Sequence, residues 1–428
     1  MMGTPLTRES PDVSIEPPLQ PRYRSLDAWR GLACLAVVIY HAASYVSDAL
    51  GHPKTGIYRV MGHGYLGVAV FFVVSGYCIA AACDTHRRSA RPGRVFILRR
   101  IRRIYPPFWI MLACMVVLIL ALGAFDPTLL QRRRSVFVDL SSLSVAQWIG
   151  NLTLSESWLC HLNQGRAKYV NVVTWSLCYE EQFYLICFVT LLLARRRFFP
   201  ALAGITVVVT VVWLMSVAGG WQRYLRGTFL DIGWWEFAFG VGVYWRLNRV
   251  KDPTWVRRID LAIYVAAAGL LLLFATQATP YQGPSWPFVN PWWGLTAALG
   301  VALILLRLRP FDDTLMNTRA GRALSAVGGF SYSLYLTHMP VCELTRTCMF
   351  RLGFWTPARG LYCVIPVSVL MSLVVGYVFY RCVERRFVNP PLSASESAAA
   401  VERRHREEGH ERTETSQPVL AGQELALA

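Results

Sequence analysis

The chain has 428 residues, of which 54% are hydrophobic and only 16% carry a charge. A soluble protein of this length would carry more charge, so the composition indicates an integral membrane protein. The net charge of +17 does not indicate nucleic-acid binding, because the arginines lie between apolar runs, where they orient membrane spans. The 11 Cys contain no CxxC pair, so we expect neither a disulfide framework nor a metal site.

Long apolar stretches follow one another along the chain, and they predict an all-α fold. We expect a polytopic membrane helix bundle of about ten transmembrane helices with no appended soluble domain. The membrane domain is expected over residues 24–390, between polar tails at 1–23 and 391–428 that lack the apolar content for a core and are predicted to be disordered. The predicted spans are Gly31–Val46, Gly64–Ala82, Pro107–Phe125, Trp175–Ala194, Phe198–Ala218, Phe229–Trp245, Leu261–Ala275, Trp292–Leu306, Leu324–Cys348 and Leu361–Tyr380.

The basic residues concentrate in alternate connecting segments, which predicts that both tails are cytoplasmic and that the chain lies in the cell (inner or plasma) membrane. The long loop 126–174 is then external. Its amphipathic piece Val145–Leu159 is expected to lie on the outer surface or to cap a cavity.

The first predicted span carries a basic residue near its start and a histidine far along it. Arg30 and His41 are eleven residues apart, so they share one helical face, about 16 Å apart along the axis. Asp27 is three residues before Arg30 and can pair with it. Apolar surroundings favour a neutral imidazole, which makes His41 a candidate general base. A histidine that only hydrogen-bonds a neighbouring helix fits this position equally well.

Two further features suit a ligand with a phosphate and a thin arm. Arg100 and Arg103 are three residues apart, so they point the same way on a helix and suit a phosphate group. The alternative is charge that only orients the span. Ser75 and Gly76 form a small notch in the second span, where either a thin ligand or another helix can approach.

The fourth predicted span carries a carboxylate near its start. Glu180 lies about 7 Å beyond Trp175 along the axis, and at that depth it must face a cavity or a cation. Tyr184 is one turn further on the same face, whereas Glu181 is turned away by about 100°.

The ninth predicted span contains the polar run Ser331, Tyr332 and His338, followed by a proline that leaves a backbone carbonyl free. His338 is either a second polar group in the cavity or a partner of this helix break. Glu236 near the start of the sixth span is another carboxylate at membrane depth.

Taken together, these residues resemble the acyltransferase-3 family of integral membrane O-acyltransferases. Six motifs occur in the order of that family, and they cover the chain from about Arg24 to Pro390. The matching segments are LDAWRG with the Arg30/His41 spacing, Phe71 to Gly76, Arg100 to Pro106, Trp175 to Tyr184, Trp235 to Gly240 and Ser331 to Pro340. Ala28 and Trp29 depart from the usual Gly and Leu, and the C-terminal esterase-like domain of some members is not expected here.

The resemblance implies transfer of an acyl group, commonly acetyl, from cytoplasmic acyl-CoA to a hydroxyl, often on a sugar of a cell-envelope or secreted glycan. It implies that the partners are the lipid bilayer, acyl-CoA and a carbohydrate or other hydroxyl acceptor, with no nucleic acid and no metal. The resemblance implies that the donor is bound by Arg100, Arg103, Ser75 and Gly76. His41, Arg30 and Glu180 act in catalysis. A multi-span transporter or flippase of a sugar-containing substrate, and a sensor that binds acyl-CoA without turnover, remain alternatives.

Overall fold

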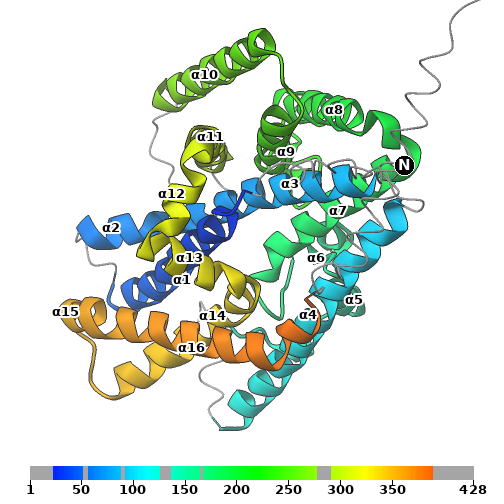
Figure 1. Ribbon diagram of the computed structural model, residues 1–428. Coiled ribbons are helices and arrows are strands. Elements are labelled where there is room, and N and C mark those ends of the chain that lie inside the picture. Colours follow the sequence, from blue (N-terminus) through cyan, green and yellow to red (C-terminus); the bar gives the residue numbers. More distant parts are fainter. Residues whose placement is uncertain are drawn as a thin grey trace, which may run out of the picture. The chain divides into compact units, whose positions relative to one another are not determined.

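The computed structural model describes residues 23–51, 56–87, 92–125, 136–163, 167–276 and 291–388. The predicted tails lie outside these residues, apart from Tyr23. Within the described residues every regular element is a helix, as predicted (Figure 1). The α-helices are α1 Leu26–Ala49, α2 Gly56–Gly62, α3 Gly67–His86, α4 Pro92–Phe125, α5 Val145–Thr153, α6 Glu156–Leu159, α7 Thr174–Leu193, α8 Phe198–Ala218, α9 Trp234–Asn248, α10 Pro253–Thr276, α11 Pro291–Leu308, α12 Asp312–Asn317, α13 Arg319–Gly329, α14 Ser331–Arg351, α15 Pro357–Arg359 and α16 Ile365–Cys382.

Seven segments of the described residues are long and apolar enough to cross a membrane. They contain α1, α3, α4, α7, α8, α11 and α16, and each coincides with a predicted span. The chain is therefore a polytopic membrane helix bundle. The other three predicted spans fall on α9, α10 and α14, which do not meet both criteria over their described residues, so the count of ten stays a prediction.

Helices α3 and α9 pack at very short range because each presents a glycine to the backbone of the other. A Cβ added at Gly76 would lie 2.2 Å from the Phe237 carbonyl oxygen, and one at Gly240 would lie 2.0 Å from that of Val73. Small residues allow such close approach in membrane helices, where dispersion contacts replace the hydrophobic effect between helices. This contact fixes the face of α3 that carries Ser75.

Glycines also allow α1 and α13 to pack at very short range. A Cβ at Gly31 would lie 2.0 Å from the Leu324 carbonyl oxygen, and one at Gly328 would lie 1.8 Å from that of Asp27. Helix α14 follows α13 directly and packs against both α1 and α16; α14 and α16 lie side by side in Figure 1. The start of α14 is therefore held beside the first turns of α1.

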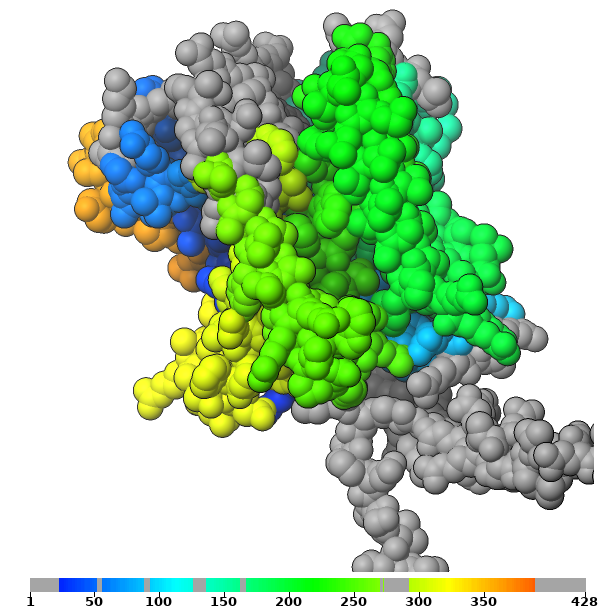
Figure 2. Space-filling view, turned by 90° about the horizontal axis from the view of Figure 1, so that it is seen from above, coloured from blue at the N-terminus to red at the C-terminus, as the bar shows by residue number. Residues whose placement is uncertain are grey.

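The predicted amphipathic piece forms α5 and α6. Ser144 caps α5 through a capping box with Gln147. The Trp109 indole donates to the Leu152 carbonyl oxygen at 2.9 Å, which ties the end of α5 to α4. Figure 2 shows another face of the molecule, with α8 in green, α10 in yellow-green and a hollow in the surface between them.

Candidate functional site: two cavities that share a wall

The first cavity lies among α1, α3, α4, α7 and α14 and has a volume of about 90 Å³. We call it the arginine cavity. It brings together eight of the residues predicted from the sequence, from five helices. These are Arg30, Ser75, Arg100, Arg103, Glu180, Tyr184, Ser331 and Tyr332.

The guanidinium groups of Arg100 and Arg103 face this cavity without an ion-pair partner among the carboxylates of the described residues. Arg100 is positioned by packing instead, with its guanidinium carbon 5.3 Å from the centre of the Tyr184 ring. Arg30 pairs with Asp27 at 3.3 Å, as its spacing predicts. Charges of one sign that are not neutralised by neighbouring side chains suit an anionic ligand.

Glu180 supplies the negative group of the arginine cavity. Its Oε1 accepts hydrogen bonds from the Ser75 hydroxyl at 2.6 Å and from the Tyr184 hydroxyl. The bond from Ser75 joins α3 to α7, the bond from Tyr184 lies within α7, and together they hold the carboxylate in one orientation. Glu181 instead accepts a hydrogen bond of 3.4 Å from Tyr105, in agreement with its predicted turn away from Glu180.

Gly76 does not line the arginine cavity. Its Cα faces the α9 backbone, so the notch predicted at Ser75 and Gly76 divides into two roles. Ser75 points into the cavity, and Gly76 provides the close contact between two helices. The helix-packing alternative therefore describes Gly76.

His41 and His338 lie together, with ring centres 5.2 Å apart, and neither lines the arginine cavity. The Nδ1 of His338 is 2.7 Å from the Tyr335 carbonyl oxygen, so Nδ1–H donates to it. The Nε2 of His338 is then an acceptor, and it is buried without a partner among the described residues. The His41 imidazole makes no hydrogen bond with another described residue, and its ring neighbours are Tyr40, Tyr45 and His338.

The carbonyl freed by Pro340 has a specific partner. Pro340 lacks the N–H that would bond to the Leu336 carbonyl four residues earlier. The side-chain amide of Asn171 donates to that oxygen at 2.8 Å. Asn171 thus provides the hydrogen bond that the free carbonyl at the helix break requires. The Nε2 of His338 takes no part in the helix break.

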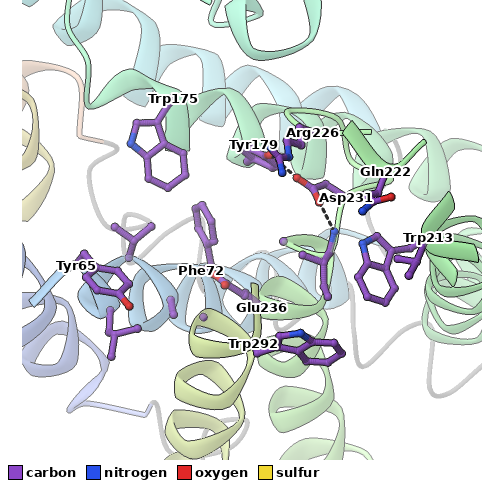
Figure 3. Close-up of a pocket in the computed structure, with 17 residues that line it drawn as sticks. Tyr65, Phe72, Trp175, Tyr179, Trp213, Gln222, Arg226, Asp231, Glu236 and Trp292 are labelled. Carbon is purple, nitrogen blue, oxygen red and sulfur yellow. Dashed lines mark hydrogen bonds between the residues drawn. The ribbon is translucent and has the colours of Figure 1, made fainter. Parts of the chain in front are cut away.

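The second cavity is larger, about 290 Å³, and we call it the tryptophan cavity (Figure 3). It lies where α7, α9 and α11 begin and α8 ends. Trp175 and Glu236, both predicted as candidates, line this cavity rather than the first. Val68 and Phe72 of α3 line both cavities, so the Phe72 side chain separates them.

Several cavity residues were not singled out from the sequence. Ser176 and Tyr335, whose hydroxyls are 2.7 Å apart, lie within the quoted motifs and alternate with the residues that were chosen. Trp213, Asp231 and Trp292 lie outside any motif. For the two tryptophans the signal in the sequence is the clustering of aromatic residues at span ends, which is also typical of a membrane interface. Asp231 has no such signal.

The fold and these cavities define a multi-pass membrane protein with a polar, arginine-lined cavity among its helices. A family model described as an acyltransferase domain matches residues 23–381. The chain therefore belongs to the acyltransferase-3 family and is an acyltransferase, as the six motifs predicted.

Curated relatives carry related names. The chain is 30% identical over 372 residues to a protein of Komagataeibacter xylinus named as a membrane-bound transacylase, BcsY, with 83% of this chain and 82% of that protein covered. It is 28% identical to the peptidoglycan O-acetyltransferase OatA of Listeria monocytogenes, over 75% of this chain and 49% of OatA. It is 26% identical to the exopolysaccharide production protein ExoZ of Rhizobium meliloti, over 81% and 93%. No solved structure matches the chain.

Proposed function

We propose that this protein transfers an acyl group, in particular acetyl, from cytoplasmic acyl-CoA to a hydroxyl of a cell-envelope or secreted glycan or glycoside. The observation that carries the proposal is the arginine cavity, where Arg30, Arg100 and Arg103 converge beside a single fixed carboxylate, Glu180. The names of OatA and ExoZ support a glycan acceptor.

The donor site follows from charge. Acyl-CoA carries phosphates, and Arg100 and Arg103 are the cavity arginines without a carboxylate partner among the described residues. Charge-assisted hydrogen bonds to phosphate are shorter and stronger than neutral ones. The pantetheine arm then passes Ser75, which lines the cavity at α3.

The reaction is nucleophilic attack of an acceptor hydroxyl on the thioester carbonyl carbon. The new C–O bond forms as His41 takes the hydroxyl proton, and the C–S bond breaks as that proton passes to the departing thiolate of CoA. Arg30, or another donor near the thioester, stabilises the oxyanion of the tetrahedral intermediate. Glu180 orients the acceptor or the base.

His41 has to reach the thioester for this step. In the structure the rings of Phe71 and Tyr335, 5.8 Å apart between their centres, both line the arginine cavity, and the Tyr335 ring centre lies 5.6 Å from that of His338. His41 itself does not line the cavity, so we propose that this wall moves for the imidazole and the thioester to meet. His338 remains the competing base, and its unpaired Nε2 is available for that role or for holding His41.

A direct comparison of two variants tests the assignment. His41→Ala should lose transfer by roughly 10²- to 10⁴-fold, the usual effect of a general base, while acyl-CoA binding persists. His338→Ala should cost less activity, or should lower expression because a buried side chain is removed. Acceptor esterification is measured at equal amounts of folded protein. Near-normal turnover in His41→Ala together with an inactive His338→Ala would assign the base to α14.

A further inference from the structure

The tryptophan cavity has a composition that differs from that of the arginine cavity. Trp213 of α8 and Trp292 of α11 stand at one end with ring centres 6.1 Å apart and planes at 85°, and Tyr65 and Trp175 stand at the other (Figure 3). Its volume of about 290 Å³ is at the lower end of the range of small-molecule sites, roughly 300–1,000 Å³. Aromatic rings supply large, rigid apolar surfaces that pack on a flat ligand.

Two carboxylates line this cavity, and their surroundings differ. Asp231 is already engaged, because it accepts hydrogen bonds from the Tyr179 hydroxyl at 2.9 Å and from the Ile232 N–H at 2.7 Å. The Glu236 carboxylate has no hydrogen bond or ion pair with any other described residue. A carboxylate in a cavity without such partners is poised to accept hydrogen bonds from a ligand.

The position of the Glu236 carboxylate depends on one glycine of the facing helix. A Cβ added at Gly294 of α11 would lie 2.4 Å from Glu236 Oε1. Because Gly294 has no side chain, there is space for the Glu236 carboxylate, which lies beside Trp292 and opposite the Phe72 ring (Figure 3).

A sugar ring combines what these groups recognise. It presents C–H groups on its faces and hydroxyl donors around its edge, so it can pack on an indole while its hydroxyls donate to a carboxylate. A fatty chain would leave Glu236 unpaired in an apolar contact, which is costly. A ligand with a negative charge would find one basic side chain in this lining, Arg226, and Arg226 lies beside the Asp231 carboxylate.

We propose that the tryptophan cavity binds one sugar unit of the acceptor glycan, with Glu236 accepting hydrogen bonds from its hydroxyls and Trp213 and Trp292 packing on its apolar face. This inference rests on the proposed function and deepens it. Phe72 lines both cavities. A hydroxyl of the bound sugar therefore reaches the thioester in the arginine cavity past the Phe72 side chain.

The test uses the full-length protein in detergent and the unacylated envelope glycan, cut to short oligosaccharides, from cells that lack the gene. Binding of the oligosaccharides and binding of acetyl-CoA are measured separately. Glu236→Gln and Trp213→Phe should each weaken oligosaccharide binding about tenfold or more and should leave the Kd of acetyl-CoA unchanged. Gly294→Ala should weaken it as well, because the added methyl displaces the carboxylate without removing a ligand contact.

Trp255→Phe is the matched control, since Trp255 is an exposed residue of α10 that lines neither cavity. Melting temperatures establish that each variant is folded. If the wild type binds acetyl-CoA but none of the oligosaccharides, or if the cavity variants bind them as the Trp255→Phe protein does, the sugar site is refuted. If the wild type does not bind acetyl-CoA, the proposed function fails independently.

Discussion

Removal of the two cavity arginines should separate a donor site from charge that only orients the span. The run 99–103 holds two pairs of arginines with the same i, i+3 spacing. Arg100 and Arg103 line the arginine cavity, whereas Arg99 and Arg102 are exposed and line neither cavity. The double variants Arg100→Ala/Arg103→Ala and Arg99→Ala/Arg102→Ala therefore change the charge equally, and only the first changes the cavity.

The magnitude follows from the contacts. Neither cavity arginine has a carboxylate partner among the described residues, so its removal leaves no carboxylate unpaired. A charge-assisted hydrogen bond to phosphate contributes about 1.5–3 kcal/mol, which is roughly 10- to 100-fold in affinity. Each single variant should weaken acetyl-CoA binding by that factor. The double variant should lose less than the product, because both groups act on one ligand.

The assay is the Kd of acetyl-CoA on purified protein, repeated with acetyl-pantetheine, which lacks the nucleotide. The loss should be large for the first donor and close to absent for the second. Because Arg100 also packs on Tyr184, the variants are compared at equal folded protein by melting temperature. Equal losses for the two donors, or an equal loss in the Arg99→Ala/Arg102→Ala protein, would refute a phosphate site at these residues.

Three further predictions concern packing, pH and topology. Gly240→Ala should lower the melting temperature and the yield because its methyl meets the α3 backbone, whereas Gly242→Ala, with open space around it, should behave as wild type. Equal melting temperatures of the two variants would contradict the close α3–α9 contact. Burial raises the pKa of Glu156 from its ordinary 4.5 to about 7, so the folded protein binds this proton more tightly than the unfolded chain does. The protonated side chain therefore stabilises the fold at low pH, and this stabilisation is lost as the pH rises through about 7. The melting temperature should therefore fall between pH 5 and 8, and Glu156→Gln should reduce that fall; an unchanged slope would show that Glu156 does not titrate there. Reporter fusions at the C-terminus should report a cytoplasmic location, and an external one would contradict the predicted orientation.

Local spacing was enough to predict much of the arginine cavity. Arg100 and Arg103 share a face because three residues make nearly one helical turn, and the Tyr184 hydroxyl bonds to Glu180 one turn earlier for the same reason. The pair Asp27–Arg30 is another contact within one helix. Polar residues at membrane depth must face a cavity or a partner, which is why these groups from separate helices could be expected to converge.

The remaining placements depend on how helices face one another, and one sequence does not encode that locally. Gly76 and Ser75 are neighbours, yet one packs on α9 and the other faces the cavity. Trp175 and Glu180 begin the same helix but serve different cavities. His41 shares a helical face with Arg30, but it does not line the arginine cavity, and its ring lies beside that of His338 on α14. No spacing rule on α1 reports a residue of α14.

The central claim, acyl transfer to a glycan hydroxyl, is tested most directly with the purified protein in lipid vesicles. Isotope-labelled acetyl-CoA and the unacylated envelope glycan from cells lacking the gene are supplied together, and both CoA thiol and labelled ester are measured by mass spectrometry. We predict that CoA is released and that the label appears as an ester on the glycan in equal amount, with both lost in His41→Ala. Transport of the glycan across the vesicle membrane without an ester, or binding of acetyl-CoA without release of CoA, would contradict the account.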